Sequence, residues 1–102
     1  MADNPIEVEH NEAARRFEAQ IEGVCAVLEY EPAGERIIFT HTRVPDALEG
    51  RGIASALARA ALEDARTRKL AVVPRCEFVR GYIRRHPEYL PLVALEFRSR
   101  LD

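Results

Sequence analysis

Cysteine is scarce in this sequence, and long hydrophobic runs are missing. The two cysteines, Cys25 and Cys76, lie far apart without the neighbouring ligand residues of a zinc site, so neither a disulfide framework nor a metal site is expected. No apolar stretch approaches the roughly 20 residues that a membrane-spanning helix needs. The opening residues lack both the basic start and the apolar run of a secretory signal. We therefore expect a cytoplasmic protein that neither spans a membrane nor has one as a partner.

The basic excess typical of nucleic-acid-binding domains is also missing. The net charge is −2 and the pI is 5.9. Aromatic side chains are not interleaved with the arginines, so nucleic acid is not expected as a partner. Residues 1–50 hold eleven acidic and four basic side chains, whereas residues 51–86 hold nine basic and three acidic ones. The second segment therefore carries a local positive field that can attract an anionic ligand. The alternative interpretation is that these arginines form an ordinary solvated surface.

The length and composition indicate a single domain over residues 1–102. A chain of 102 residues matches the usual size of one independent domain. With 47% hydrophobic and 31% charged residues, it can build a packed core and stay soluble. No repeat, linker or low-complexity segment divides it.

The first forty-odd residues alternate between apolar and polar side chains, as strands do. Four strands are predicted, over residues 6–10, 17–21, 24–30 and 37–42. In the last of them, Ile37, Phe39 and His41 are expected on one face. A turn is expected over residues 32–34, where proline and glycine occur together. The short connections favour an antiparallel meander.

The period then changes to that of a helix. Apolar residues recur every four positions from 53 to 65, which predicts an amphipathic helix. The apolar run at 70–73 is typical of a short strand. A second helix is predicted from near Cys76 to the residues before Pro87, and residues 93–100 are expected to form a short helix or strand.

The unit from residue 36 to residue 73 is expected to be a right-handed crossover between two parallel strands. The sequence thus predicts an α+β fold, with a mixed antiparallel and parallel sheet of about five strands and two main helices. A ligand is expected where the fourth strand gives way to the first helix, over residues 41–55.

The segment that joins this strand to the helix contains two glycines. Gly50 and Gly52 allow a tight turn and a close approach of backbone N–H groups to a ligand. A helix N-terminus attracts anions, so a pyrophosphate fits here, and Arg51 can add a charge-assisted contact. The alternative is an ordinary glycine-rich helix cap.

Four segments carry a resemblance to a known family. The first, Glu49-Gly50-Arg51-Gly52-Ile53-Ala54, resembles the pyrophosphate signature of GNAT acetyltransferases, although Glu49 stands where that superfamily prefers Gln or Arg. With residues 41–45, 73–79 and 85–92, it resembles a family of very short, single-domain GNAT-like N-acetyltransferases over about residues 5–93. The resemblance implies a compact GNAT-like fold that lacks the usual early helices.

The resemblance also implies a co-substrate, acetyl-CoA or CoA, and an amine acceptor, either a small amine or a protein. The parallel strands at 36–42 and 70–73 would splay apart and hold the pantetheine arm between them. It would pair with the backbone near Thr42 and Val44. The pyrophosphate would rest on the helix start, formed by Gly50, Arg51, Gly52, Ile53, Ala54 and Ser55. An arginine is expected to meet the 3′-phosphate.

Two side chains are candidates for catalysis. Cys76 is expected to open the second helix beside Arg75 and Arg80, which favours the thiolate, the form that can attack a thioester. A cysteine at this position is an active-site candidate in the short family; the alternative is a small packing residue. His41 can act as general base on an incoming ammonium, or simply bond backbone at a strand end.

Other polar residues are expected to be structural. Cys25 is interpreted as packing in the third strand. Tyr82 can protonate a departing thiolate in GNAT enzymes, but its apolar neighbours favour core packing. His86 is interpreted as a cap or surface residue and His10 as structural.

Three functions remain open on the sequence alone. An enzyme that moves an acetyl group to an amine is the first, and the acidic N-terminal half favours a cationic acceptor such as a polyamine. A CoA-binding module without turnover, acting as a sensor or a subunit, is the second. A purely structural adaptor is the third, and it leaves the glycine turn unexplained.

Overall fold

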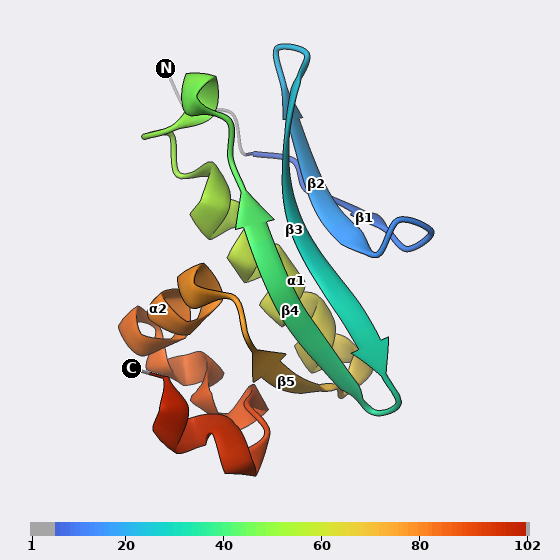
Figure 1. Cartoon of the computed structure of the whole chain (residues 1–102), viewed down its shortest axis with the longest axis vertical. Helices are drawn as coiled ribbons and strands as arrows, with labels where there is room; N and C mark the ends of the chain where they lie inside the picture. Colours follow the sequence, from blue (N-terminus) through green and yellow to red (C-terminus); the bar gives the residue numbers. More distant parts are fainter. Residues whose placement is uncertain (1–5, 102) are drawn as a thin grey trace.

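The computed structural model of the chain describes residues 6–101. Its five strands form one sheet in the order β1-β2-β3-β4-β5, antiparallel throughout except for the parallel pair β4 and β5 (Figure 1). The elements are β1 (Glu9–Asn11), β2 (Arg16–Ile21), β3 (Val24–Ala33), β4 (Arg36–Arg43), η1 (Asp46–Leu48), α1 (Ile53–Arg68), β5 (Ala71–Pro74), α2 (Glu77–Arg85), η2 (Pro87–Leu92) and η3 (Leu95–Arg100). The predicted α+β class, with a mixed five-stranded sheet and two main helices, is confirmed.

Two strand boundaries differ from the prediction. β1 covers only Glu9–Asn11, because its pairing with β2 begins where Glu9 faces Glu18. β3 continues through Pro32, which pairs with Ile37, although a turn was expected there. The pairing of β3 with β2 stops at Glu29, opposite Arg16, so Pro32 has no neighbouring strand on that side. A proline is tolerated where a strand lies at an edge.

The core lies between the sheet and α1. One face of α1 is fully buried and contacts β2 and β3, and its many alanines let the helix approach the sheet closely. The buried residues of α1 are Ile53, Leu57, Ala58, Ala61, Leu62 and Ala65. α2 packs on α1, β4 and β5 and extends the same core. Between residues 6 and 52 the structure contains no α-helix, as expected for a chain without the early helices.

The parallel pair ends in the middle of β4. Its pairing with β5 stops at Phe39, opposite Pro74, whereas β4 runs on to Arg43. The carboxyl-terminal residues of β4 therefore have no strand on that side, which is where a splay between the two strands was expected. α1 and α2 both begin beyond these strand ends (Figure 1).

A bulge in β4 changes which side chains face the core. The pairing of β3 with β4 shifts between Glu29 and Tyr30, so that Phe39 faces Tyr30 and Thr42 faces Leu28. Because one extra residue of β4 lies between them, Thr42 joins the face of Phe39. The expectation that His41 shares a face with Ile37 and Phe39 is wrong for this reason.

Candidate functional site

The glycine turn adopts the conformation that only glycine takes easily. Gly50 has φ 82° and Gly52 has φ 76°, both in the left-handed region. An added Cβ would meet no atom within 4 Å at either position, so it is the backbone conformation and not crowding that requires glycine here.

This turn leads directly into an uncapped helix. Gly52 is the N-cap of α1, and the first helical bond runs from the N–H of Ala56 to the carbonyl of Gly52 at 3.0 Å. No side chain caps the helix. The N–H groups of Ile53, Ala54 and Ser55 precede that bond and are the donors that a helix start offers to an anion.

A hollow of about 320 Å³ lies against this helix start. Its volume falls within the range of about 300 to 1,000 Å³ that small-molecule pockets occupy. Six of the residues predicted to bind the co-substrate line it: Val44, Gly50, Gly52, Ile53, Ala54 and Ser55. The other lining residues are Leu48, Glu49 and Phe78.

Two of these lining residues, Leu48 and Phe78, were not predicted for the site. Leu48 ends η1 and is fully buried, so it forms an apolar floor. Phe78 lies in the first turn of α2 and was assigned to the core, but it is only half-buried. A bulky apolar residue two positions after the N-cap of a helix was the signal available in the sequence.

Arg51 does not line the hollow. Its guanidinium lies 3.7 Å from the carboxylate of Glu22, at the tip of the β2–β3 hairpin, and both side chains are largely exposed. Glu49, in contrast, is part of the lining. Among the described lining residues, Glu49 alone has a charged side chain, and it is acidic. The attraction for an anion therefore comes from backbone N–H groups.

Cys76 lies at the N-cap of α2, as predicted. Its N–H donates to the carbonyl of Phe39 at 2.8 Å, which ties the start of α2 to β4. The sulfur lies 3.0 Å from the hydroxyl oxygen of Thr42. Arg80 donates to the carbonyl of Arg75 at 2.8 Å, so its charge lies beside this backbone without contacting the sulfur.

The two cysteines differ in exposure in an unexpected way. Cys76 is buried, with 5% of its surface exposed. Cys25, interpreted as a packing residue, is the more exposed of the two, and its thiol donates a hydrogen bond to the carbonyl of Ala26 at 3.7 Å.

His41 does not meet Cys76. Its backbone pairs with that of Glu29. Its side chain is exposed and lies on the opposite face of β4 from Thr42. Among residues 6–101 it makes no side-chain hydrogen bond or ion pair. The structure thus brings Thr42 and Cys76 together and leaves His41 apart from them.

The remaining candidates have structural surroundings. Tyr82 is buried in the core and stacks on His86 with ring centroids 4.2 Å apart. Burial raises the pKa of Tyr82 above its usual value. His86 is the C-cap of α2, and its N–H donates to the carbonyls of Tyr82 and Ile83. His10 stacks on Phe17, with centroids 4.2 Å apart.

Within residues 6–101, no helix is both long and apolar enough to cross a membrane. The same part of the chain contains no group of three or more histidine, cysteine or acidic side chains placed to hold a metal ion.

Known proteins resemble this chain over most of its length. Residues 16–92 match the family described as GCN5-related N-acetyl-transferase. The chain is 42% identical over 86 residues to protein NATD1 of Gallus gallus, covering 81% of this chain and 78% of that one. Protein NATD1 of Homo sapiens is also 42% identical over 86 residues, covering 81% of this chain and 76% of the relative. The relative of the same name from Danio rerio is 34% identical over 90 residues, covering 83% and 82%.

Proposed function

We propose, since this chain belongs to the GCN5-related N-acetyltransferase family, that it binds acetyl-CoA at the glycine turn and transfers the acetyl group to an amine. The observation that carries the proposal is the uncapped start of α1, which follows two glycines in the left-handed region and lines a hollow. Backbone N–H groups at such a helix start are suited to a pyrophosphate.

In the proposed complex, the N–H groups of Ile53, Ala54 and Ser55 donate to the pyrophosphate. The side chain of Glu49 must turn away from it, because two like charges repel. The pantetheine arm follows the backbone from Val44, directly after β4, to Thr42 within it, on the side where β5 no longer pairs.

The acetyl group passes to a neutral amine in one step. The amine nitrogen bonds to the thioester carbonyl carbon, the carbon–sulfur bond breaks, and the CoA sulfur leaves as a thiolate that takes up the proton lost by the nitrogen. Backbone N–H groups polarise the carbonyl. His41, exposed on β4, is the candidate general base that takes a proton from the incoming ammonium and so produces the neutral amine.

A covalent route through Cys76 is the second mechanism. The Cys76 thiolate would bond to the thioester carbonyl carbon while the bond to the CoA sulfur breaks and CoA leaves as a thiolate. The amine nitrogen would then bond to that carbon, and the Cys76 sulfur would leave as a thiolate that takes up the proton lost by the nitrogen. The contact of 3.0 Å with the Thr42 hydroxyl favours this route, since a hydroxyl that donates to the sulfur stabilises the thiolate.

Binding without turnover is the alternative function. It is favoured by the lack of an α-helix between residues 6 and 52, because such helices wall the acceptor site in larger members of the superfamily. A sensor or a subunit would need only the co-substrate hollow.

The test compares two glycine variants by calorimetry with CoA. Gly52→Val places a side chain in the turn and should weaken binding at least about tenfold, or 1.4 kcal/mol. Gly34→Val is the matched control, because Gly34 also has a positive φ, 65°, with open space around it, but lies in the β3–β4 turn. Equal losses in both variants would mean that strain, and not the site, is responsible.

Turnover is measured separately, as release of CoA thiol from acetyl-CoA with spermidine and with a lysine-containing peptide. Amine-dependent release supports the transferase. Tight binding of acetyl-CoA without release in the presence of either amine supports the binding module.

A further inference from the structure

Three arginines from separate elements converge at the end of the molecule opposite the glycine turn. Arg15 comes from the β1–β2 turn, Arg36 from the start of β4 and Arg68 from the last turn of α1. They line a hollow of about 220 Å³. The 16 residues of α1, about 24 Å of helix, separate this hollow from the proposed co-substrate site.

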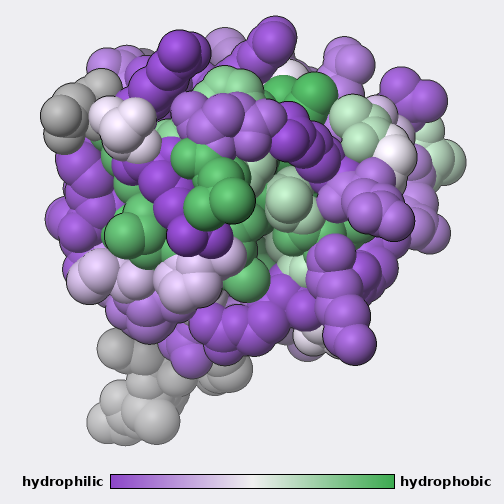
Figure 2. Space-filling model, turned by 90° about the horizontal axis from the view of Figure 1, so that it is seen from below, coloured by the Kyte–Doolittle hydropathy of each residue, from purple (hydrophilic) through white to green (hydrophobic). Residues whose placement is uncertain are grey.

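The hollow has an apolar part as well. Pro32, Ile37 and Leu70 line it beside the arginines. Figure 2 views the molecule from this end and shows apolar side chains lying between hydrophilic ones. A ligand here would meet positive charge on one side and hydrocarbon on the other.

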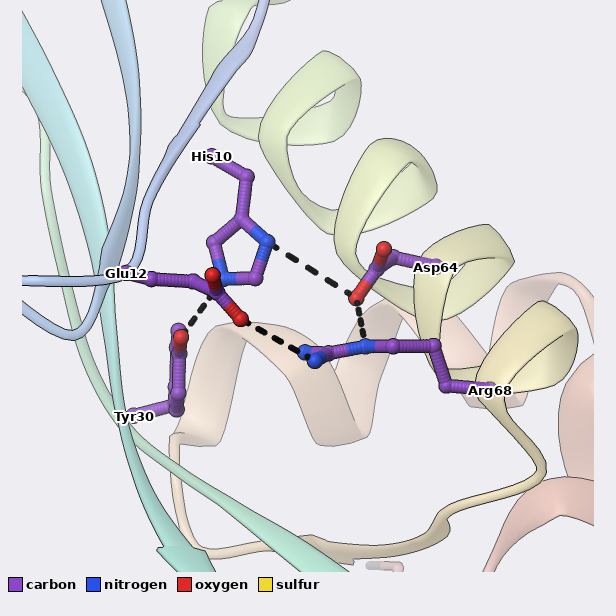
Figure 3. Close-up of polar contacts among 5 residues, drawn as sticks. All are labelled: His10, Glu12, Tyr30, Asp64 and Arg68. Atoms are coloured by element: carbon purple, nitrogen blue, oxygen red, sulfur yellow. Dashed lines mark hydrogen bonds and ion pairs between the residues drawn. The ribbon is translucent and has the colours of Figure 1, made fainter.

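Arg68 is held in a fixed position. Its Nε donates to Asp64 at 2.9 Å, and a terminal nitrogen donates to Glu12 at 3.3 Å (Figure 3). Both carboxylates lie to the sides of the guanidinium, which has five N–H groups in all and retains others for a ligand. A guanidinium fixed in this way loses little freedom on binding.

Tyr30 forms the inner wall. Its phenol oxygen lies 2.5 Å from Nε2 of His10, whose other ring nitrogen lies 4.0 Å from Asp64 (Figure 3). Burial raises the pKa of Tyr30 above its usual value, so the phenol keeps its proton. The hydroxyl is thus a fixed polar group on a residue that lines the hollow.

The charges of the lining favour an anion. Glu12 is the single acidic residue among the lining residues, against three arginines. Arg36 is engaged on one side by Glu96, at 2.5 Å and outside the hollow, and this pair is exposed. Arginine forks match the oxygens of a phosphate, whereas an ammonium would meet three arginines and one carboxylate, that of Glu12.

We propose that this hollow binds a small phosphate monoester, held by Arg15, Arg36 and Arg68 and packed against Pro32, Ile37 and Leu70. This site is separate from the proposed acetyl-CoA site, and neither depends on the other.

The test is an amide NMR titration with phenyl phosphate at constant ionic strength. Saturable shifts are expected at Gly34 and Leu70. The double variant Arg15→Gln, Arg36→Gln should weaken this binding at least about fivefold, since two charge-assisted contacts are lost. The control is Arg59→Gln, Arg100→Gln, which removes two exposed arginines outside the hollow and should leave binding unchanged.

Further probes separate the components of the site. Inorganic phosphate should bind more weakly than phenyl phosphate, because it cannot use the apolar wall, and phenol alone should give no saturable shift. Shifts confined to residues 52–55 would show that phosphate binds only at the start of α1 and would overturn the proposal. Equal affinity in the double variant, with its fold intact by melting temperature, would also overturn it, as would equal affinity for phosphate and phenyl phosphate.

Discussion

Thr42 and Cys76, 34 positions apart in the chain, meet with 3.0 Å between hydroxyl oxygen and sulfur. The bulge in β4 turns Thr42 to the core face, and the N-cap position of Cys76 brings the sulfur to it. Phe78, two residues beyond Cys76, lines the hollow at the glycine turn. The pair therefore joins the carboxyl end of β4 to the start of α2, the helix that contributes Phe78 to the hollow.

Replacing Cys76 with serine distinguishes direct from covalent transfer. In direct transfer no thiolate is needed, and Cys76→Ser keeps a polar group for Thr42. We expect turnover within about threefold of wild type and CoA affinity unchanged, measured by thiol release and calorimetry.

A covalent role would look different. Turnover would fall by about a hundredfold or more with normal CoA binding, and a peptide containing Cys76 would carry an acetyl group after rapid quenching. Cys76→Ala, which leaves Thr42 without a partner, controls for the loss of the contact itself.

The two thiols should react at different rates in the native protein. Because Cys76 is 5% exposed and Cys25 is half-buried, a bulky disulfide reagent should modify Cys25 first. In Cys25→Ser, the remaining thiol should react rapidly only after urea unfolding. Fast reaction of Cys76 in that folded variant would mean that the start of α2 opens readily.

The ion pair between Glu22 and Arg51 predicts an effect on CoA affinity. In the free protein, Glu22 holds the arginine that lies in the glycine turn. Glu22→Gln should release it for the pyrophosphate and tighten CoA binding by about two- to fivefold at low salt, with a smaller gain at high salt.

The control for Glu22 is Glu31→Gln, which removes the same charge from an exposed position near the other end of β3. An equal gain in both variants would mean that only net charge matters. Arg51→Gln should remove the gain when combined with Glu22→Gln.

Much of this fold could be predicted from the sequence, because its periodicity is strong. The helix start at Ile53, the N-cap at Cys76 and the parallel pairing of β4 with β5 all follow from apolar spacing, glycine and proline. The glycine turn was predicted as a site for the same reason, since a left-handed backbone before a helix leaves a readable pattern.

The Thr42–Cys76 pair could not be predicted. Strict alternation places Thr42 on the face away from Phe39, and only the bulge reverses it. A single extra residue within a strand leaves no trace in the period of the pattern. The hollow with three arginines could not be predicted for another reason. Its arginines come from separate elements that only the tertiary fold brings together.

The pair formed by Tyr89 and Glu63 predicts how stability depends on alkaline pH. The buried phenol of Tyr89 donates to the carboxylate of Glu63 at 2.6 Å. Burial, and then this hydrogen bond, raise the pKa of Tyr89 from 10.0 to about 12. The folded protein therefore keeps a proton that the unfolded chain releases, and stability falls as pH rises above the unfolded pKa.

Comparison of wild type with Tyr89→Phe by urea unfolding measures this effect. At pH 8 the variant should be less stable by about 1 kcal/mol, the usual cost of a lost hydrogen bond. At pH 11 the wild type alone has lost about 1.4 kcal/mol, since the folded phenol remains protonated while the unfolded one is ionised. The difference between the two proteins should thus disappear just below pH 11, and by about pH 12 the variant should be the more stable of the two. A difference that stays constant from pH 8 to pH 12 would mean that Tyr89 titrates alike in both states and that its contact with Glu63 does not hold the proton.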